Sequence, residues 1–182
     1  HASEQIKQMA HEGHEVGSHT YLHRRISQLS YNELVQELKR SKKIIEEVTG
    51  VECSSFVPPW DKPQIIFNKA IDFKPCSFFP KKSKLTFKQI CSALHGSGYK
   101  TIRVCPATSR FNRFKMSKPF IKEGITCIPC RLSNGFASEA KRLVKKAIQE
   151  KGLAVVYAHP RGLSHEGPQN KKFFVDFIQF IN

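Results

Sequence analysis

Segments with helical periodicity alternate along this chain with short apolar runs, and this order limits the possible folds more than any other feature. Helices are expected over residues 3–12, 30–50, 86–95, 138–151 and 170–181. Strands are expected over residues 14–19, 53–57, 100–105, 125–132 and 152–159. A chain that alternates helix and strand in this way is typical of an α/β fold with a mostly parallel sheet.

The expected helix over residues 30–50 has the clearest boundaries. Ser30 and Glu33 have the spacing of a capping box, in which each residue satisfies a backbone amide of the other. Gly50 is a natural stop, because glycine readily adopts the left-handed conformation that ends a helix. A mostly apolar stripe at helical spacing lies between them and consists of Leu34, Leu38, Ser41, Ile45 and Val48.

Two other segments differ from this regular pattern. The run over residues 152–159 is continuously apolar, which indicates a strand that is buried on both faces of a parallel sheet. Residues 61–84 have no clean period and carry prolines and lysines, so we expect an excursion from the alternating pattern there. With 182 residues and 40% hydrophobic content, the chain is long enough for a single domain over residues 1–182. No apolar run approaches the length of a membrane span.

The chain is strongly basic. Its formal net charge of +15 favours contact with polyanions such as nucleic acid, anionic glycans or a membrane surface. The lysines are dispersed and recur on the solvated faces of the expected helices, and no recognisable nucleic-acid module occurs. A lysine-rich solvated surface is therefore favoured over a nucleic-acid partner.

The cysteines lie mostly inside apolar stretches, at Cys53, Cys76, Cys91, Cys105, Cys127 and Cys130. Burial as thiols is the default, and disulfide pairing stays open because connectivity cannot be read from a sequence. Cys127 and Cys130 form a Cys-x-x-Cys pair, but no second pair completes a zinc site at finger spacing. As a metal motif this pair is weak.

Residues that suit chemistry follow three of the expected strands, where parallel α/β folds gather their sites. His19 and His23 follow the first strand, Pro59 and Trp60 follow the second, and His159 follows the last. Imidazole nitrogens bind zinc at about 2.0 to 2.1 Å, and two histidines four residues apart can reach one ion. Two ordinary polar residues at a loop edge would have the same spacing. The spacing alone therefore does not decide whether His19 and His23 are metal ligands or polar loop residues.

Three stretches resemble the polysaccharide deacetylase family, the NodB-homology carbohydrate esterases. The stretch GHEVGSHTYLHRR resembles the family's histidine motif H-[ST]-x-x-H, with His19 and His23 at the two histidine positions. The stretch VPPW at residues 57–60 resembles the motif R-P-P-[YFW], and LAVVYAHPRG places His159 where the family has a late histidine. The order and the separations of the three stretches agree with the family.

The resemblance implies a distorted (β/α) barrel and metal-assisted hydrolysis of an acetyl group from an amino sugar of a glycan. His19 and His23 would bind a divalent metal, expected to be zinc, with an aspartate as a third ligand and a second aspartate as the base. His159 would be the acid, with a buried structural histidine as the alternative. Pro59 and Trp60 would contact the substrate, with an ordinary core position as the alternative for Trp60.

The chain also departs from the family. The family's Thr-Phe-Asp-Asp stretch lies upstream of the histidine motif, and nothing before His19 resembles it, so the N-terminal strands of the barrel are expected to be missing. Val57 stands where the family has an arginine. Arg131 is the candidate that would replace this charge, with a plain surface arginine as the alternative.

These departures leave two functions from different classes. Deacetylation of a glycan is expected of a full-length protein, with this chain supplying part of the machinery. The alternative is a catalytically degenerate module of the same fold that binds glycan without turnover, and a basic nucleic-acid-associated protein is less favoured. The family is often exported or located at the cell envelope, and residues 1–13 lack the apolar stretch of a signal peptide.

Overall fold

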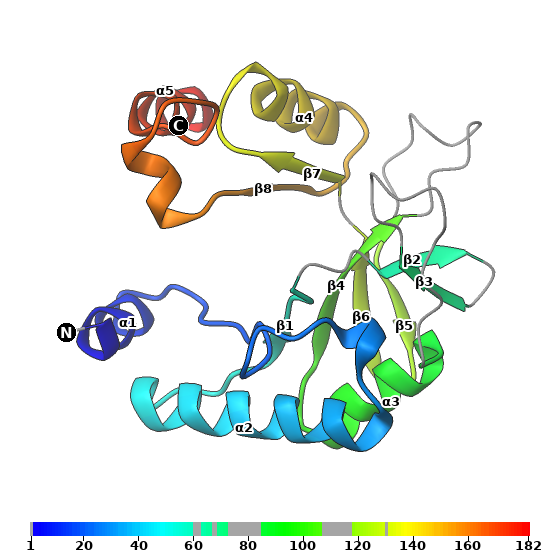
Figure 1. The fold of residues 1–182 in the computed structure, drawn as a ribbon. Helices are drawn as coiled ribbons and strands as arrows, with labels where there is room; N and C mark the ends of the chain where they lie inside the picture. The colour runs from blue at the N-terminus through cyan, green and yellow to red at the C-terminus, as the bar shows by residue number, and fades with distance from the viewer. Residues whose placement is uncertain (1, 60–62, 67–68, 73–84, 107–117, 130) are drawn as a thin grey trace. The chain divides into compact units, whose positions relative to one another are not determined.

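The computed structural model describes residues 2–59, 63–66, 69–72, 85–106, 118–129 and 131–182, which form a mixed α/β structure (Figure 1). The chain divides into two compact units. The N-terminal unit comprises His1–Ala107 and Pro119–Ile128, and the C-terminal unit comprises Thr108–Lys118 and Pro129–Asn182. Each unit is described by itself, and the single domain over residues 1–182 stays a prediction.

The helices of the N-terminal unit are α1 (Ala2–His11), the 3-10 turn η1 (Ile26–Gln28), α2 (Tyr31–Thr49) and α3 (Phe87–Gly96). The capping box predicted for α2 is confirmed. The backbone amide of Ser30 donates to Glu33 Oε2 at 2.8 Å, and the amide of Glu33 donates to Ser30 Oγ at 3.4 Å. Gly50 ends α2 with a φ of 72°, as its position predicted.

Six strands form the sheet of the N-terminal unit: β1 (Ser55–Phe56), β2 (Pro63–Ile66), β3 (Lys69–Asp72), β4 (Thr101–Pro106), β5 (Phe120–Lys122) and β6 (Ile125–Pro129). Their order is β3-β2-β4-β6-β5, and β1 pairs with β4 alongside this path (Figure 1). Both β1 and β2 run parallel to β4, whereas β2 with β3 and β5 with β6 form antiparallel pairs.

One apolar core joins the sheet of this unit to its helices. Phe56 of β1 and Ile102 of β4 are register partners, and both are almost fully buried. They belong to the same cluster as Leu34 and Leu38 of α2 and Leu94 of α3. Since the predicted stripe of α2 supplies Leu34 and Leu38, the helical periodicity identified the buried face of this helix correctly.

Two expectations for the N-terminal unit need correction. Residues 14–19 contain a single bridge, Ser18 with Phe56, and no longer strand, because only Ser18 pairs with the neighbouring chain. The expected excursion over residues 61–84 contains β2 and β3, which pair with each other and extend the sheet beside β4. The rest of that segment lies outside the described residues.

The C-terminal unit contains β7 (Arg131–Asn134), α4 (Ser138–Gln149), β8 (Ala154–Tyr157), the 3-10 turn η2 (Pro160–Ser164) and α5 (Lys171–Ile181). The strands β7 and β8 form a parallel two-stranded sheet. Phe177 of α5 is buried and packs against the ring of Phe136, at 5.8 Å between ring centroids. This aromatic contact links the segment after β7 to the last helix.

Two strand predictions for the C-terminal half are also corrected. The expected strand over residues 125–132 divides into β6 and β7, which belong to separate sheets. Pro129 ends β6, and proline has no amide hydrogen to continue the ladder. The run that was expected to be buried on both faces is only half-buried in β8, because β8 pairs with one strand among the residues that the structure describes.

The mixed α/β class is therefore confirmed, and a closed barrel stays a prediction. Within the described ranges, the strands belong to two sheets. None of the helices described here is long and apolar enough to cross a membrane.

Candidate metal-binding loop

His19 and His23 lie close together on the loop that follows the Ser18 bridge. Their ring centroids are 4.9 Å apart, the ring planes are inclined at 62°, and both residues are exposed. The loop is not helical, since Thr20 and His23 have positive φ values of 62° and 55°. The two rings therefore meet through a local backbone reversal and not through the face of a helical turn.

A carbonyl oxygen of the next motif holds the ring of His19. The Nδ1 atom of His19 lies 2.6 Å from the carbonyl oxygen of Val57. A carbonyl can only accept a hydrogen bond, so this contact assigns the proton to Nδ1 and leaves the lone pair of the ring on Nε2. A hydrogen bond of this kind is what orients metal-ligating histidines in proteins.

The backbone before the histidines is fixed against β1. The amide of Ser18 donates to the carbonyl of Ser55, and the amide of Val57 donates to the carbonyl of Ser18, both at 2.9 Å. Gly17 packs closely against Ser55, because a Cβ atom at position 17 would clash with the Ser55 hydroxyl. A larger residue at position 17 would therefore force the Ser55 side chain to move where the loop approaches β1.

Helix α2 supports the same loop with buried polar side chains. The amide of Leu22 donates to Glu37 Oε2 at 2.8 Å, and Ser18 Oγ donates to Ser41 Oγ at 2.9 Å. Ser18, Glu37 and Ser41 are all buried. Because the carboxylate of Glu37 is buried and accepts this hydrogen bond, Glu37 contributes directly to the conformation of the loop between the two histidines.

Charged residues of α2 also contact the loop at its surface. The guanidinium of Arg40 lies 4.0 Å from the ring centroid of Tyr21, a distance typical of a cation–π contact. Arg24 forms a 3.0 Å ion pair with Glu33. The histidine loop is thus attached to α2 on both sides of His23.

The histidine pair fits two positions of an imidazole-ligated metal centre. Both residues carry ring nitrogens of the kind that bind zinc, and the contact of Nδ1 with the Val57 carbonyl makes Nε2 the nitrogen through which His19 would bind a metal. The hydroxyl of Thr20 is buried and has no hydrogen-bond partner in the part of the chain that the structure describes. In the same ranges no group of three or more His, Cys, Asp or Glu side chains occurs. Within the described ranges the structure therefore brings two imidazole rings together, and the metal-binding role of His19 and His23 stays a prediction.

The proline motif lies directly beside the histidine loop. Pro58 and Pro59 are buried at the end of β1, while Trp60 lies outside the described residues. The substrate-binding role of Pro59 and Trp60 stays a prediction.

Arg103 is a polar residue of this region that the sequence analysis did not identify. It lies in the middle of β4, and its Nη2 atom donates to the carbonyl of Pro58 at 3.4 Å. Its Nε atom is buried and lacks a hydrogen-bond partner within the described ranges. The sequence does contain a sign that could have identified Arg103. It is a charged residue at the centre of the apolar strand expected over residues 100–105.

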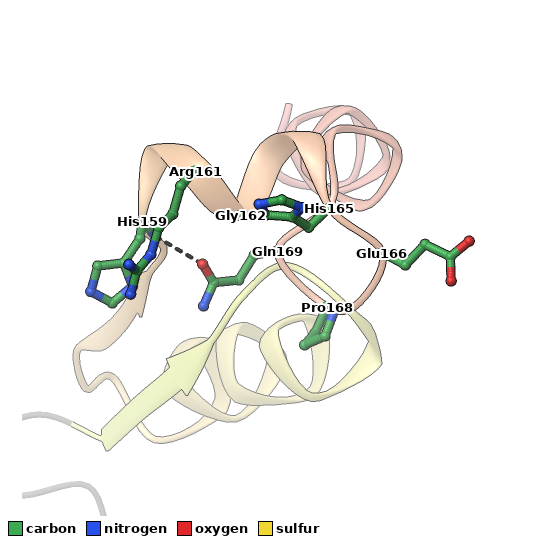
Figure 2. A pocket seen from close by; sticks show the side chains of 7 residues that line it. All are labelled: His159, Arg161, Gly162, His165, Glu166, Pro168 and Gln169. Atoms are coloured by element: carbon green, nitrogen blue, oxygen red, sulfur yellow. Dashed lines mark hydrogen bonds between the residues drawn. The ribbon is translucent and has the colours of Figure 1, made fainter.

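The two remaining predicted residues, His159 and Arg131, belong to the C-terminal unit. His159 follows β8, is exposed, and donates its backbone amide to Gln169 Oε1 at 2.9 Å. It lines a hollow of about 280 Å³ together with Arg161 and His165, whereas Glu166 extends away from the other side chains (Figure 2). Arg131 begins β7, and its side chain is not among the described ones. The acid role of His159 and the charge-replacing role of Arg131 stay predictions.

Together the α/β fold and the histidine loop define a protein with a two-histidine candidate metal site beside the end of a strand. Residues 1–68 match the polysaccharide deacetylase family. This match supports the family that the histidine and proline motifs predicted. The matched segment contains the whole histidine loop, α2 and β1.

Individual relatives cover less of the chain or are more distant. The uncharacterized protein YlxY of Bacillus subtilis (strain 168) is 36% identical over 53 residues, which is 29% of this chain and 17% of that protein. A CE4 family pseudoenzyme from Bacillus anthracis is 14% identical, with a TM-score of 0.47, over 97% of this chain and 46% of the other. The Xyl-CE4 domain of a multidomain xylanase, from the hindgut metagenome of Trinervitermes trinervoides, is 12% identical, with a TM-score of 0.49, over 99% of this chain and 62% of that one. The chain thus spans less than two thirds of each of these relatives.

Proposed function

We propose that this chain is part of a metal-dependent hydrolase that removes acetyl groups from amino sugars of a glycan. The observation that carries the proposal is the 2.6 Å contact between His19 Nδ1 and the carbonyl of Val57. This contact orients one imidazole for metal binding, and the ring of His23 lies beside it. The match of residues 1–68 to the polysaccharide deacetylase family supports the choice of reaction.

In this proposal His19 and His23 hold a divalent metal, for which zinc is the first candidate. Such an ion would polarise the acetyl carbonyl and lower the pKa of a bound water to about 7. The task of the chain's own residues is to fix the two imidazoles. Val57 fixes the ring of His19, and Glu37 fixes the backbone of the loop through the amide of Leu22.

His159 is proposed as the group that donates a proton to the leaving amine. This role comes from the sequence resemblance, and its chemistry is that of an imidazole, which can donate a proton near neutral pH. Pro59 and Trp60 are proposed to contact the sugar, and the barrel is proposed as the fold of the whole domain. Nothing before His19 resembles the aspartate motif of the family, so the proposal assigns no residue of this chain to the two aspartates.

The proposal is tested on the protein encoded by the whole gene, supplied with zinc or cobalt and a chito-oligosaccharide. Release of acetate by the wild type is the expected result. His159→Ala should lower turnover by roughly a hundredfold or more while zinc affinity stays nearly unchanged, because general acid catalysis contributes about that factor. His165→Ala is the matched control, since His165 is an exposed histidine at the same hollow.

The alternative function gives a different result in the same assay. A protein that binds the oligosaccharide but releases no acetate with either metal would be a glycan-binding module without turnover. Full activity of His159→Ala would instead show that His159 is not the proton donor. The metal-binding part of the proposal would be unaffected by that result.

A further inference from the structure

The backbone of His159 is held from both sides at the turn after β8. Its amide donates to Oε1 of Gln169, a side chain ten residues further along the chain, at 2.9 Å (Figure 2). Its carbonyl accepts from the amide of Gly162 in η2 at 2.8 Å. Both backbone hydrogen-bonding groups of His159 are therefore occupied, and one of the two partners is a side chain.

Gln169 has little room to move, because two glycines approach it closely. A Cβ atom at position 162 would collide with Oε1 of Gln169 and would lie 2.8 Å from its Cβ atom. A Cβ atom at position 135 would collide with the carbonyl of Pro168 and would lie 2.9 Å from the backbone nitrogen of Gln169. The amide of Phe136 also donates to the carbonyl of Pro168 at 2.6 Å. Glycine permits this close approach of the backbone, which here confines Gln169 on two sides.

The same contacts tie the loop of Gln169 to the end of β8. The amide of Gly135 donates to the carbonyl of Tyr157, the last residue of β8, at 2.8 Å. The ring of Tyr157 lies edge-on to the ring of His159, at 6.3 Å between the ring centroids. The segment after β7, the end of β8 and the loop before α5 thus form one connected structure around His159. A residue supported by packing and hydrogen bonds in this way keeps a defined geometry.

We propose that Gln169 is a positioning residue for His159, whose backbone it fixes so that the imidazole starts from one defined point after β8. The inference rests on the proposed function, in which His159 donates a proton to the leaving amine. Proton transfer needs the donor within hydrogen-bond reach of the acceptor, and a displacement of about 1 Å can lower a rate about a hundredfold. Gln169 acts through the backbone of His159 and is assigned no contact with the glycan.

Turnover of chito-oligosaccharide by the protein encoded by the whole gene, supplied with zinc, tests this role. Gln169→Leu removes the acceptor oxygen and should lower kcat by about tenfold or more, whereas Gln169→Glu keeps an acceptor oxygen and should restore most of it. In the His159→Ala protein, Gln169→Leu should cause no further loss. A side chain that only supported the fold would lower the activity of both backgrounds by the same factor.

The matched control for this substitution is Gln149→Leu. Gln149 is an exposed glutamine at the end of α4, so its replacement should leave turnover as in the wild type.

Nuclear magnetic resonance without metal gives a second readout that does not involve catalysis. A cross-hydrogen-bond coupling should join the amide of His159 to the side-chain carbonyl carbon of Gln169 in the wild type. In Gln169→Leu the His159 amide should exchange with solvent about tenfold or more faster, and in Gln169→Glu it should be protected again. The amide of Gly135 is the internal reference, since its bond to Tyr157 does not use Gln169. The wild-type coupling keeps the test decisive if Gln169→Leu does not fold.

The inference is overturned if the wild type shows no coupling to Gln169, or if Gln169→Leu lowers turnover equally with and without His159. A wild type that releases no acetate would refute the proposed function, while the coupling and the exchange rates would still decide whether Gln169 holds His159. Conversely, full turnover of Gln169→Leu in an active deacetylase would leave the proposed function in place and remove the positioning role.

Discussion

The imidazole of His19 and the carbonyl of Val57 are 38 residues apart in sequence and 2.6 Å apart in space. This contact joins the histidine motif to the proline motif. It uses a backbone atom of residue 57, so it does not depend on the valine side chain that stands where the resembling family has an arginine. The orientation of His19 is thereby independent of the side chain at position 57.

The first prediction concerns the metal. Zinc should bind the wild-type chain weakly, because the described residues supply two ligands, and His19→Ala should weaken this binding by about tenfold or more. Isothermal titration calorimetry with zinc measures both affinities. His11→Ala is the control, since His11 is an exposed histidine at the end of α1. Equal affinities for the wild type and His19→Ala would contradict the hypothesis that His19 binds the metal.

The second prediction concerns the support of the loop by α2. Glu37→Ala leaves the amide of Leu22 without its acceptor, so it should lower the free energy of unfolding by about 1 to 3 kcal/mol. Urea denaturation followed by circular dichroism measures the change. Glu47→Ala is the matched control on the same helix, because Glu47 is exposed and its pair with Lys43 is long, at 3.7 Å. A loss as small as that of the control would show that Glu37 does not support the loop.

The third prediction concerns pH. Hydrogen bonds from the backbone and hydroxyl of Ser30, together with Arg24, lower the pKa of Glu33 from 4.5 to about 2. A carboxylate with a lowered pKa stabilises the folded state above its unfolded pKa, and this contribution is lost as the pH falls from about 4.5 to about 2. Glu33→Gln should therefore show a smaller loss of stability over this range. Thermal unfolding at several pH values tests the difference, and parallel curves for the two proteins would contradict it.

The fourth prediction concerns the thiol of Cys53. Burial raises the pKa of Cys53 from 9.0 to about 11. Only the thiolate reacts with iodoacetamide, so the native chain at pH 8 should label Cys53 about a hundredfold more slowly than the unfolded chain does. Mass spectrometry of peptides from timed reactions measures both rates. Rapid labelling of native Cys53 would show that this part of the core opens readily.

Local features of the fold could be predicted from the sequence, and pairings between distant segments could not. The capping box of Ser30 and Glu33 and the stop at Gly50 depend on residues within a few positions of each other, and both occur as predicted. The division of residues 125–132 between two sheets depends on β5 and β8, which lie outside the run itself. A periodicity within one segment contains no information about such partners.

The same distinction applies to the site. The spacing and surroundings of His19 and His23 were sufficient to single them out, since the motif is contiguous. Glu37 and Arg103 act through contacts with Leu22 and Pro58, and these depend on how α2 and β4 are placed. Glu37 also looked like an ordinary polar position of an amphipathic helix, although it is buried. Its role emerges only when the acceptor of each loop amide is identified.

The left-handed backbone at His23 restricts how this site can change through mutation. With a φ of 55°, position 23 favours asparagine, aspartate, histidine or glycine, and a cysteine or glutamate there would strain the chain by about 1 to 2 kcal/mol. Among these four favoured residues, aspartate is the common metal ligand besides histidine. A single substitution could therefore exchange a nitrogen ligand for an oxygen ligand without moving the loop, and shift its preference toward harder cations. Conversion to a thiolate site would require the loop itself to be rebuilt.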